Sequence, residues 1–199
     1  MKKLLAAICL MILSAPAFAQ MQSGGFHLDR RSTYYGLRLG FTSASIGGDY
    51  DLDSRAGLTI GGIVGLKCSP SVPLFLESGL YYTEKGGKEG HVKVREDYLE
   101  IPFLMKYGFN VGGDVAILPY VGPTFGFGIA GKTKIDGLET DTFDDNGMKR
   151  FDVGIKLGCG VEWNMLYGEL GYHWGVTNIS DNELDAFNRA FYMNIGINF

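Results

Sequence analysis

One glycine-rich segment contains the residues of a phosphate-binding loop. Residues 126–133 read GFGIAGKT, which fits the G-x-x-x-x-G-K-T pattern of a P-loop. A P-loop binds phosphate where a glycine turn joins a strand to a helix, because backbone N–H groups at the helix start face the anion. Here the glycines alternate with Phe125, Phe127 and Ile129, and no helical pattern follows. We therefore interpret the segment as a glycine-rich strand and predict no nucleotide or other cofactor.

Two acidic segments contain residue types that bind cations. Residues 49–53, DYDLD, resemble the start of an EF-hand loop, which needs Gly at its sixth position and Glu at its twelfth. This sequence has Ser54 and Ile60 at those positions. The acidic segment 136–145 is interpreted in the same way. We predict solvated loops without metal ligands, and loose cation binding is the open alternative.

The composition is typical of an all-β chain with a crowded interior. Glycine accounts for 30 of 199 residues, about twice its usual share of ~7%, and aromatic residues reach 13%. The net charge of −4 argues against a nucleic-acid binder. Three cysteines are too few for a disulfide scaffold. The length fits a single domain.

The N-terminus has the three parts of a secretory signal peptide. Lys2 and Lys3 precede the apolar run 4–13, and residues 17–19, AFA, fit the A-x-A cleavage rule. The apolar run is only about half of the ~20 residues that a transmembrane helix needs, although an uncleaved anchor is the alternative. The predicted parts are a signal peptide, residues 1–19, cleaved after Ala19; a periplasmic leader, 20–32; and a barrel domain, 33–199.

Period-two alternation recurs along the rest of the chain. In 98–109, for example, Leu99, Ile101 and Phe103 lie at every second position, which is the pattern of a strand with one apolar face. Each such run has roughly ten residues, the length that a tilted membrane strand needs. We predict an all-β fold, namely an eight-stranded antiparallel up-and-down transmembrane β-barrel. The predicted strands are 35–41, 58–68, 74–83, 98–109, 116–131, 151–163, 167–177 and 190–199.

Short and long connections alternate strictly. In outer-membrane barrels the short turns face the periplasm and the long loops face outward. An even number of strands then places both termini in the periplasm. The short connections are 69–73, 110–114 and 164–165, and the long ones are 43–56, 84–97, 132–150 and 178–189.

The polar face of the strands points into the barrel in this interpretation. A soluble barrel such as a lipocalin would alternate equally well with its apolar face inward. Two features favour the membrane form: the polar face is rich in glycine, and its charges balance, as charges in a closed interior must. We expect Lys156 to point into the interior near a Glu, such as Glu162 or Glu169. The predicted interior charge network is Arg38, Lys67, Lys106 and Lys156 with Glu77, Glu100, Glu162 and Glu169.

Aromatic residues gather at the strand ends, as they do where a barrel meets the membrane–water interfaces. Packing in a protein core is the alternative role for any one of them. The predicted interface aromatics are Tyr35, Tyr107 and Trp163, with Phe199, at the periplasmic end, and Tyr82, Phe151, Trp174 and Phe191 at the outer end.

Several segments resemble the PorT-like outer-membrane β-barrel family. Residues 98–107, YLEIPFLMKY, are similar to its signature strand, and 119–122, 152–162 and 175–179 are similar to later strands. The terminal Phe199 resembles the C-terminal signal by which the barrel-assembly machinery takes up its substrates. The resemblance implies an outer-membrane location and this fold. The family is named after a member needed for protein export through the type IX secretion system.

Catalysis at the barrel rim is a further possibility, because some eight-stranded membrane barrels are enzymes with His, Asp and Ser there. His173, Ser180 and Asp181 have the residue types for such a site. The sequence has no nucleophile-elbow pattern and no H-E-x-x-H motif. We favour a packed, hydrogen-bonded His173 and predict no catalytic residue and no enzyme activity.

The predicted role is structural or surface interaction through acidic outer loops. The alternatives are an accessory role in secretion across the outer membrane and a narrow porin, although eight strands leave room only for side chains. Expected partners are outer-membrane lipid and lipopolysaccharide, the assembly machinery at the C-terminal strand, and secretion or surface proteins, with no nucleic acid and no nucleotide. Cys68 and Cys159 are expected to be free thiols on opposite walls.

Overall fold

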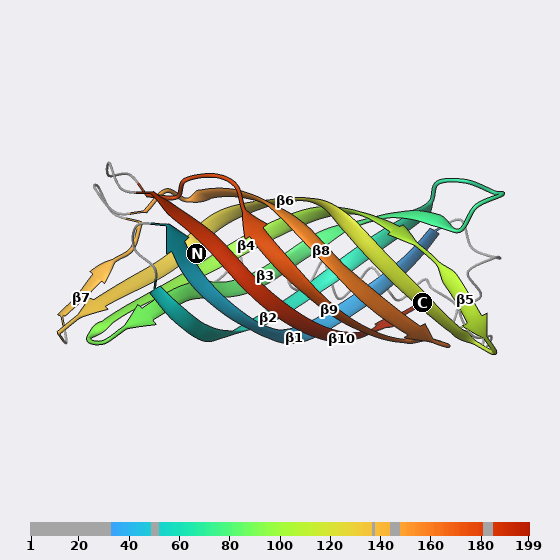
Figure 1. Ribbon diagram of the computed structural model, residues 1–199, viewed down its shortest axis with the longest axis horizontal. Coiled ribbons are helices and arrows are strands. Elements are labelled where there is room, and N and C mark those ends of the chain that lie inside the picture. Colours follow the sequence, from blue (N-terminus) through green and yellow to red (C-terminus); the bar gives the residue numbers. More distant parts are fainter. Residues whose placement is uncertain (1–32, 49–51, 137, 144–147, 181–184) are drawn as a thin grey trace, which may run out of the picture.

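The computed structural model describes residues 33–48, 52–136, 138–143, 148–180 and 185–199. The predicted signal peptide and leader lie outside these ranges. Eight long antiparallel strands form a closed barrel (Figure 1), because β1 pairs with β10 and β4 pairs with β6. The wall strands are β1 (Thr33–Gly48), β2 (Leu52–Lys67), β3 (Leu74–Glu89), β4 (Val92–Tyr107), β6 (Val115–Ile135), β8 (Phe151–Trp163), β9 (Leu166–Gly175) and β10 (Ala186–Asn198).

Two short strands extend the wall at opposite ends of the barrel (Figure 1). β5 (Phe109–Gly112) and β7 (Leu138–Asp141) pair with the first and the last part of β6. We call the end with β5 the short-turn end and the end with β7 the long-hairpin end. Among the described residues, no helix is long and apolar enough to cross a bilayer.

The barrel has its apolar side chains outside and its polar side chains inside, as predicted. Leu157 and Ile195 are each 63% exposed on the outer face, whereas Lys106 is 0% and Arg38 is 1% exposed inside. An apolar belt of this size is unfavourable in water and favourable against acyl chains. The all-β, eight-stranded antiparallel barrel is therefore confirmed, and the lipocalin-like alternative is wrong because its apolar face would be buried.

Glycines make room for large side chains in the narrow interior. Gly65 lies under the ring of Tyr34, and Gly160 lies under the ring of Tyr167. A Cβ atom at either position would overlap the tyrosine ring. The glycine-rich polar face of the sequence thus reflects the tyrosines that fill the barrel.

The short connections 69–73 and 164–165 agree with the prediction, whereas 110–114 is partly strand because β5 pairs with β6 there, and the long connections also differ from the prediction. β8 and β9 are joined by Asn164 and Met165 alone, and Asn164 has a positive φ of 53°, which asparagine tolerates better than most residues. In contrast, most of the predicted loops 43–56 and 84–97 continues as paired strand, and in 132–150 residues 132–135 and 138–141 are paired. The strands were cut short in the prediction because their outward face turns polar there, although backbone pairing does not depend on that polarity.

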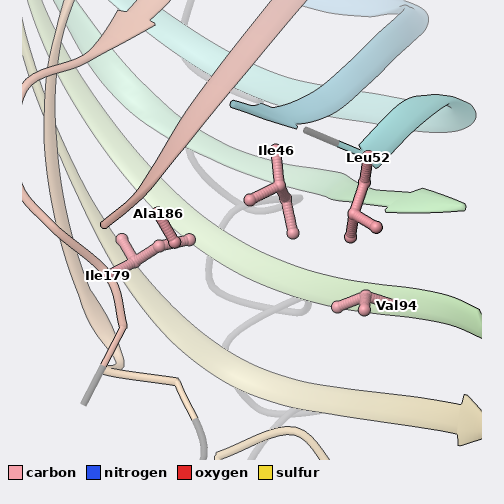
Figure 2. Packing of buried hydrophobic residues seen from close by; sticks show 5 residues of the cluster. All are labelled: Ile46, Leu52, Val94, Ile179 and Ala186. Carbon is pink, nitrogen blue, oxygen red and sulfur yellow. The ribbon is translucent and has the colours of Figure 1, made fainter. Parts of the chain in front are cut away.

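The interior at the long-hairpin end is apolar. Ile46, Leu52, Val94, Ile179 and Ala186 form a buried cluster contributed by three wall strands, the 176–185 connection and the start of β10 (Figure 2). The outward side chains next to this cluster are polar: Asp53 follows Leu52, and Lys93 and Arg95 flank Val94, and all three are exposed. The two faces therefore exchange character along the barrel, and the long-hairpin end is packed like a small water-soluble barrel.

Candidate functional site

The first group of interior charges lies toward the short-turn end. The Glu77 carboxylate forms an ion pair with Lys106, at 2.8 Å from Oε1 to Nζ, and a second one with Arg38, at 3.5 Å from Oε2 to Nη2. Lys106 Nζ is also 3.7 Å from Glu169 and donates to the Tyr167 hydroxyl at 2.7 Å. All of these side chains are buried. Two cations and two carboxylates thus neutralise each other inside the wall.

The second group lies nearer the long-hairpin end. Glu100 bridges Lys85 and Lys156, each at 2.7 Å. Lys85 Nζ also contacts Asp152 at 2.9 Å and His173 Nε2 at 3.1 Å. These contacts join β3, β4, β8 and β9 across the interior. Breaking such a buried pair costs several kcal/mol because it leaves an uncompensated charge.

The structure changes two members of the predicted network. Six of the eight predicted residues form interior ion pairs. Lys67, at the end of β2, is half-buried and makes no ion pair with the described residues. Glu162 is buried, but its carboxylate accepts a hydrogen bond from Asn198 at 2.7 Å in place of an ion pair. Lys156 pairs with Glu100 at 2.7 Å, so the prediction of a glutamate partner is confirmed, although the partner is neither Glu162 nor Glu169.

Lys85 and Asp152 take the places of Lys67 and Glu162 in the ion-paired set. The described interior then contains four ion-paired cations and four ion-paired carboxylates. Glu96 and Glu162 are also buried but form no ion pair, so the predicted balance applies to the paired side chains alone. Lys85 was missed because strand 74–83 was ended two residues too early. Asp152 was on the polar face of a predicted strand, and its tethering by Asn188 at 3.1 Å could not be read from the sequence. The full paired set is Arg38, Lys85, Lys106, Lys156, Glu77, Glu100, Asp152 and Glu169.

The space left between the two groups is small. A cavity bordered by Thr59, Lys85, Glu100, His173 and Tyr192 has a volume of about 20 Å³. A cavity of ~10–15 Å³ by this measure holds one water molecule. This cavity therefore has room for about one or two waters and for no larger solute.

The remaining chemical motifs do not form a site in the described part of the chain. Residues 126–133 lie within β6 and pair with β4 and β8. His173 is 1% exposed among ion-paired neighbours, and Ser180 is buried near the long-hairpin end. Among the described residues, no three His, Cys, Asp or Glu side chains could hold a metal ion. Asp49, Asp51, Asp144, Asp145 and Asp181 lie outside the described residues.

The interface aromatics lie in two sets on the outer face. The strand register places the periplasmic set at the short-turn end and the other set toward the long-hairpin end. Phe199 exchanges backbone hydrogen bonds with Tyr35 at 2.9 and 3.0 Å, so it helps to close the β1–β10 seam; its role as an assembly signal stays a prediction. Tyr35, Tyr107, Phe151, Trp163, Trp174 and Phe191 are exposed, and Tyr82 is half-buried.

The described part of the long-hairpin end has mixed charge. Six acids of the predicted acidic loops, Asp49, Asp51, Asp144, Asp145, Asp181 and Glu183, lie outside the described residues, so the acidic outer surface stays a prediction. Glu139 on β7 accepts hydrogen bonds from Lys132 at 3.2 Å and Lys134 at 3.3 Å, and these bonds hold the pKa of Glu139 below its ordinary value. The described cations at this end are Arg55, Lys88, Lys93, Arg95, Lys132, Lys134, Lys149, Arg150 and Arg189, and the acids are Asp53, Glu84, Glu89, Asp97, Asp136, Glu139, Asp141 and Asp185.

Comparison with known families identifies the barrel. Residues 18–181 match the family described as outer membrane protein beta-barrel domain. The chain belongs to this family. It is therefore an outer-membrane β-barrel, and the predicted location in the outer membrane is supported. No curated protein matches it.

Solved barrels of the same fold have little sequence in common with the chain. Neisserial surface protein A is 14% identical, with 85% of this chain and 98% of that chain covered and a TM-score of 0.50. A major outer membrane protein from Thermus thermophilus is 12% identical, with 85% and 100% covered and a TM-score of 0.50. At these identities the likeness concerns the fold alone.

Proposed function

We propose that this protein is a non-enzymatic outer-membrane barrel that presents its long hairpins at the cell surface. The long-hairpin end faces outward, and both termini lie in the periplasm after signal-peptide cleavage following Ala19. The observation that carries the proposal is the occupied interior. Two groups of ion-paired side chains and an apolar cluster lie inside the barrel, and the cavity between the two charge groups measures only about 20 Å³. Such an interior suits a rigid support and not a channel.

The hairpins are built as a platform. β3 and β4 stay paired as far as the Glu89–Val92 turn, and β6 continues to Ile135. The apolar cluster around Ile46 and Val94 packs inside this extension. Burial of apolar side chains stabilises the extension beyond the belt that contacts lipid, so the surface offered to partners is held in a fixed shape.

Surface labelling tests the orientation. In a Cys68→Ser/Cys159→Ser background, Leu138→Cys places a thiol where the native side chain is 77% exposed on β7. The matched control is Ser71→Cys, which is exposed at the short-turn end. We expect a membrane-impermeant maleimide to label position 138 on intact cells and position 71 only after the outer membrane is permeabilised. The reverse pattern would refute the proposed orientation.

An accessory role in secretion is the second candidate, favoured by the resemblance to the PorT-like family. β5 gives it a structural basis: Phe109 and Val111 are exposed at the short-turn end, which is periplasmic in the proposed orientation. A strain lacking the protein would then fail to secrete cargo, and Phe109→Ser/Val111→Ser would reproduce the defect with the barrel still assembled. Normal secretion in the deletion strain would exclude this role.

A narrow porin is the third candidate, and the filled interior argues against it.

A further inference from the structure

Three lysines lie side by side on the outer face of the long-hairpin end. Lys88 on β3 is directly opposite Lys93 on β4, and Lys93 is directly opposite Lys134 on β6. All three are exposed. Neighbouring strands are about 4.8 Å apart, so the row places three positive charges within roughly 10 Å. Like charges directly opposite each other destabilise a sheet.

The acids near this row do not neutralise its centre. Glu139 pairs with Lys134 at 3.3 Å, at one end of the row. Asp53 is opposite Lys88 in the register at the other end, but the two form no ion pair. Lys88 and Lys93 make no ion pair with any residue that the structure describes. An anion supplied from outside the chain would relieve their repulsion.

The row lies beyond the apolar belt, on the side of the long hairpins. On β4 the outermost lipid-facing apolar side chain is Leu99. Lys93 precedes Leu99 by six residues on the same strand. At about 3.3 Å per residue and a tilt of about 40°, Lys93 lies roughly 15 Å beyond Leu99. Lysine side chains can also bend toward the membrane surface. The row therefore faces sideways, toward the headgroups of the surrounding lipid.

We propose that Lys88, Lys93 and Lys134 bind the phosphate groups of a phosphorylated glycolipid of the outer leaflet, such as lipopolysaccharide. Ammonium groups bind phosphate as point charges, and basic residues close to a membrane surface attract anionic headgroups. This inference rests on the proposed function for the outward orientation of the row. Its ligand differs from the protein partners that the hairpin tips would meet.

The test uses the purified full-length barrel in non-ionic detergent micelles. Native mass spectrometry follows the binding of phosphorylated lipid A, of the same lipid A after enzymatic removal of its phosphates, and of lipid A in the presence of millimolar inorganic phosphate. The variant is Lys88→Gln/Lys93→Gln. The matched control is Lys67→Gln/Lys149→Gln, which removes two charges elsewhere on the barrel, and Lys88→Arg/Lys93→Arg keeps the charge of the row.

Each lysine near an anionic membrane surface contributes favourably to the free energy of lipid binding. The double variant, which lacks two of them, should therefore bind phosphorylated lipid A about tenfold or more weakly than the wild type. We expect the control and the Arg variant to stay within about twofold of the wild type, and dephosphorylated lipid A to bind the wild type as weakly as phosphorylated lipid A binds the variant. Equal binding by variant and wild type, or by the two lipids, would overturn the proposal. Displacement by inorganic phosphate would overturn the lipid as ligand. Surface labelling at position 138 does not depend on lipid A binding. A wrong orientation can therefore be distinguished from a wrong assignment of the lysine site.

Discussion

Replacing Glu100 by Gln tests whether the interior charges stabilise the barrel. Glu100 is 1% exposed and holds Lys85 and Lys156, each at 2.7 Å. The amide keeps the shape of the side chain and removes its charge. Lys85 retains Asp152 at 2.9 Å, but Lys156 loses its one ion-pair partner among the described residues. Two charge-assisted hydrogen bonds contribute about 1.5–3 kcal/mol each, and breaking a buried pair costs about 3–5 kcal/mol. We therefore expect a loss of about 3–5 kcal/mol in the free energy of unfolding.

The chain offers a matched control at Glu139. This carboxylate also bridges two lysines, Lys132 and Lys134, but it is exposed. Exposed ion pairs contribute little because water and salt screen them. Glu139→Gln should therefore leave the free energy of unfolding unchanged within error, although the two substitutions are chemically identical.

The assay is reversible urea unfolding in lipid vesicles, followed by tryptophan fluorescence. Trp163 and Trp174 are 55% and 60% exposed on the lipid-facing side, so their emission should change when the barrel leaves the bilayer. An unchanged midpoint for Glu100→Gln would refute the claim that the interior pairs stabilise the fold. Equal losses for Glu100→Gln and Glu139→Gln would show that burial is not the cause.

Three further predictions concern the outer face and the chain ends. Ile155→Arg places a charge where the side chain is 47% exposed in the apolar belt, and it should cost about 2–4 kcal/mol in the same vesicles; a neutral substitution would contradict the lipid-facing assignment. Cys68 and Cys159, both free and exposed, should be alkylated without prior reduction, and an intramolecular disulfide in non-reduced peptides would show that the register is wrong. The mature protein should begin at Gln20, and a mass that includes residues 1–19 would instead indicate an uncleaved anchor.

The membrane-facing half of the barrel could be predicted from the sequence because lipid imposes a simple alternation. Residues 151–163 were predicted as a strand with the bounds that β8 has. Apolar side chains such as Ile155 and Leu157 must face acyl chains, and the alternate side chains must face inward. That constraint acts at every second residue across the belt, so the period-two alternation of apolar residues is sufficient there to predict the strand and the direction of its side chains.

The long-hairpin end could not be predicted in this way, since the two faces exchange character. Ile46 and Val94 point inward there, whereas Lys93 and Arg95 point outward. A search for an outward apolar set therefore stops at the edge of the belt. The same truncation removed Lys85 from the predicted network.

The pairing of interior charges is the other part that the sequence does not contain. Alternation gives the face of Lys156, but its side chain reaches past β6 to Glu100 on β4, which is not a neighbouring strand of β8. Lys67 shows the opposite error. It has the phase of an interior residue, but it is the last residue of β2 and lies half-buried at the rim.

Single-channel recording in planar lipid bilayers tests the central claim, a barrel closed by its own side chains, most directly. Two charge groups and an apolar cluster occupy the interior, and the cavity between the charge groups, about 20 Å³, is too small for a water-filled path through that level of the barrel. The purified protein should insert without producing stable openings. Steady conductance of porin size from the folded, wild-type barrel would contradict the account.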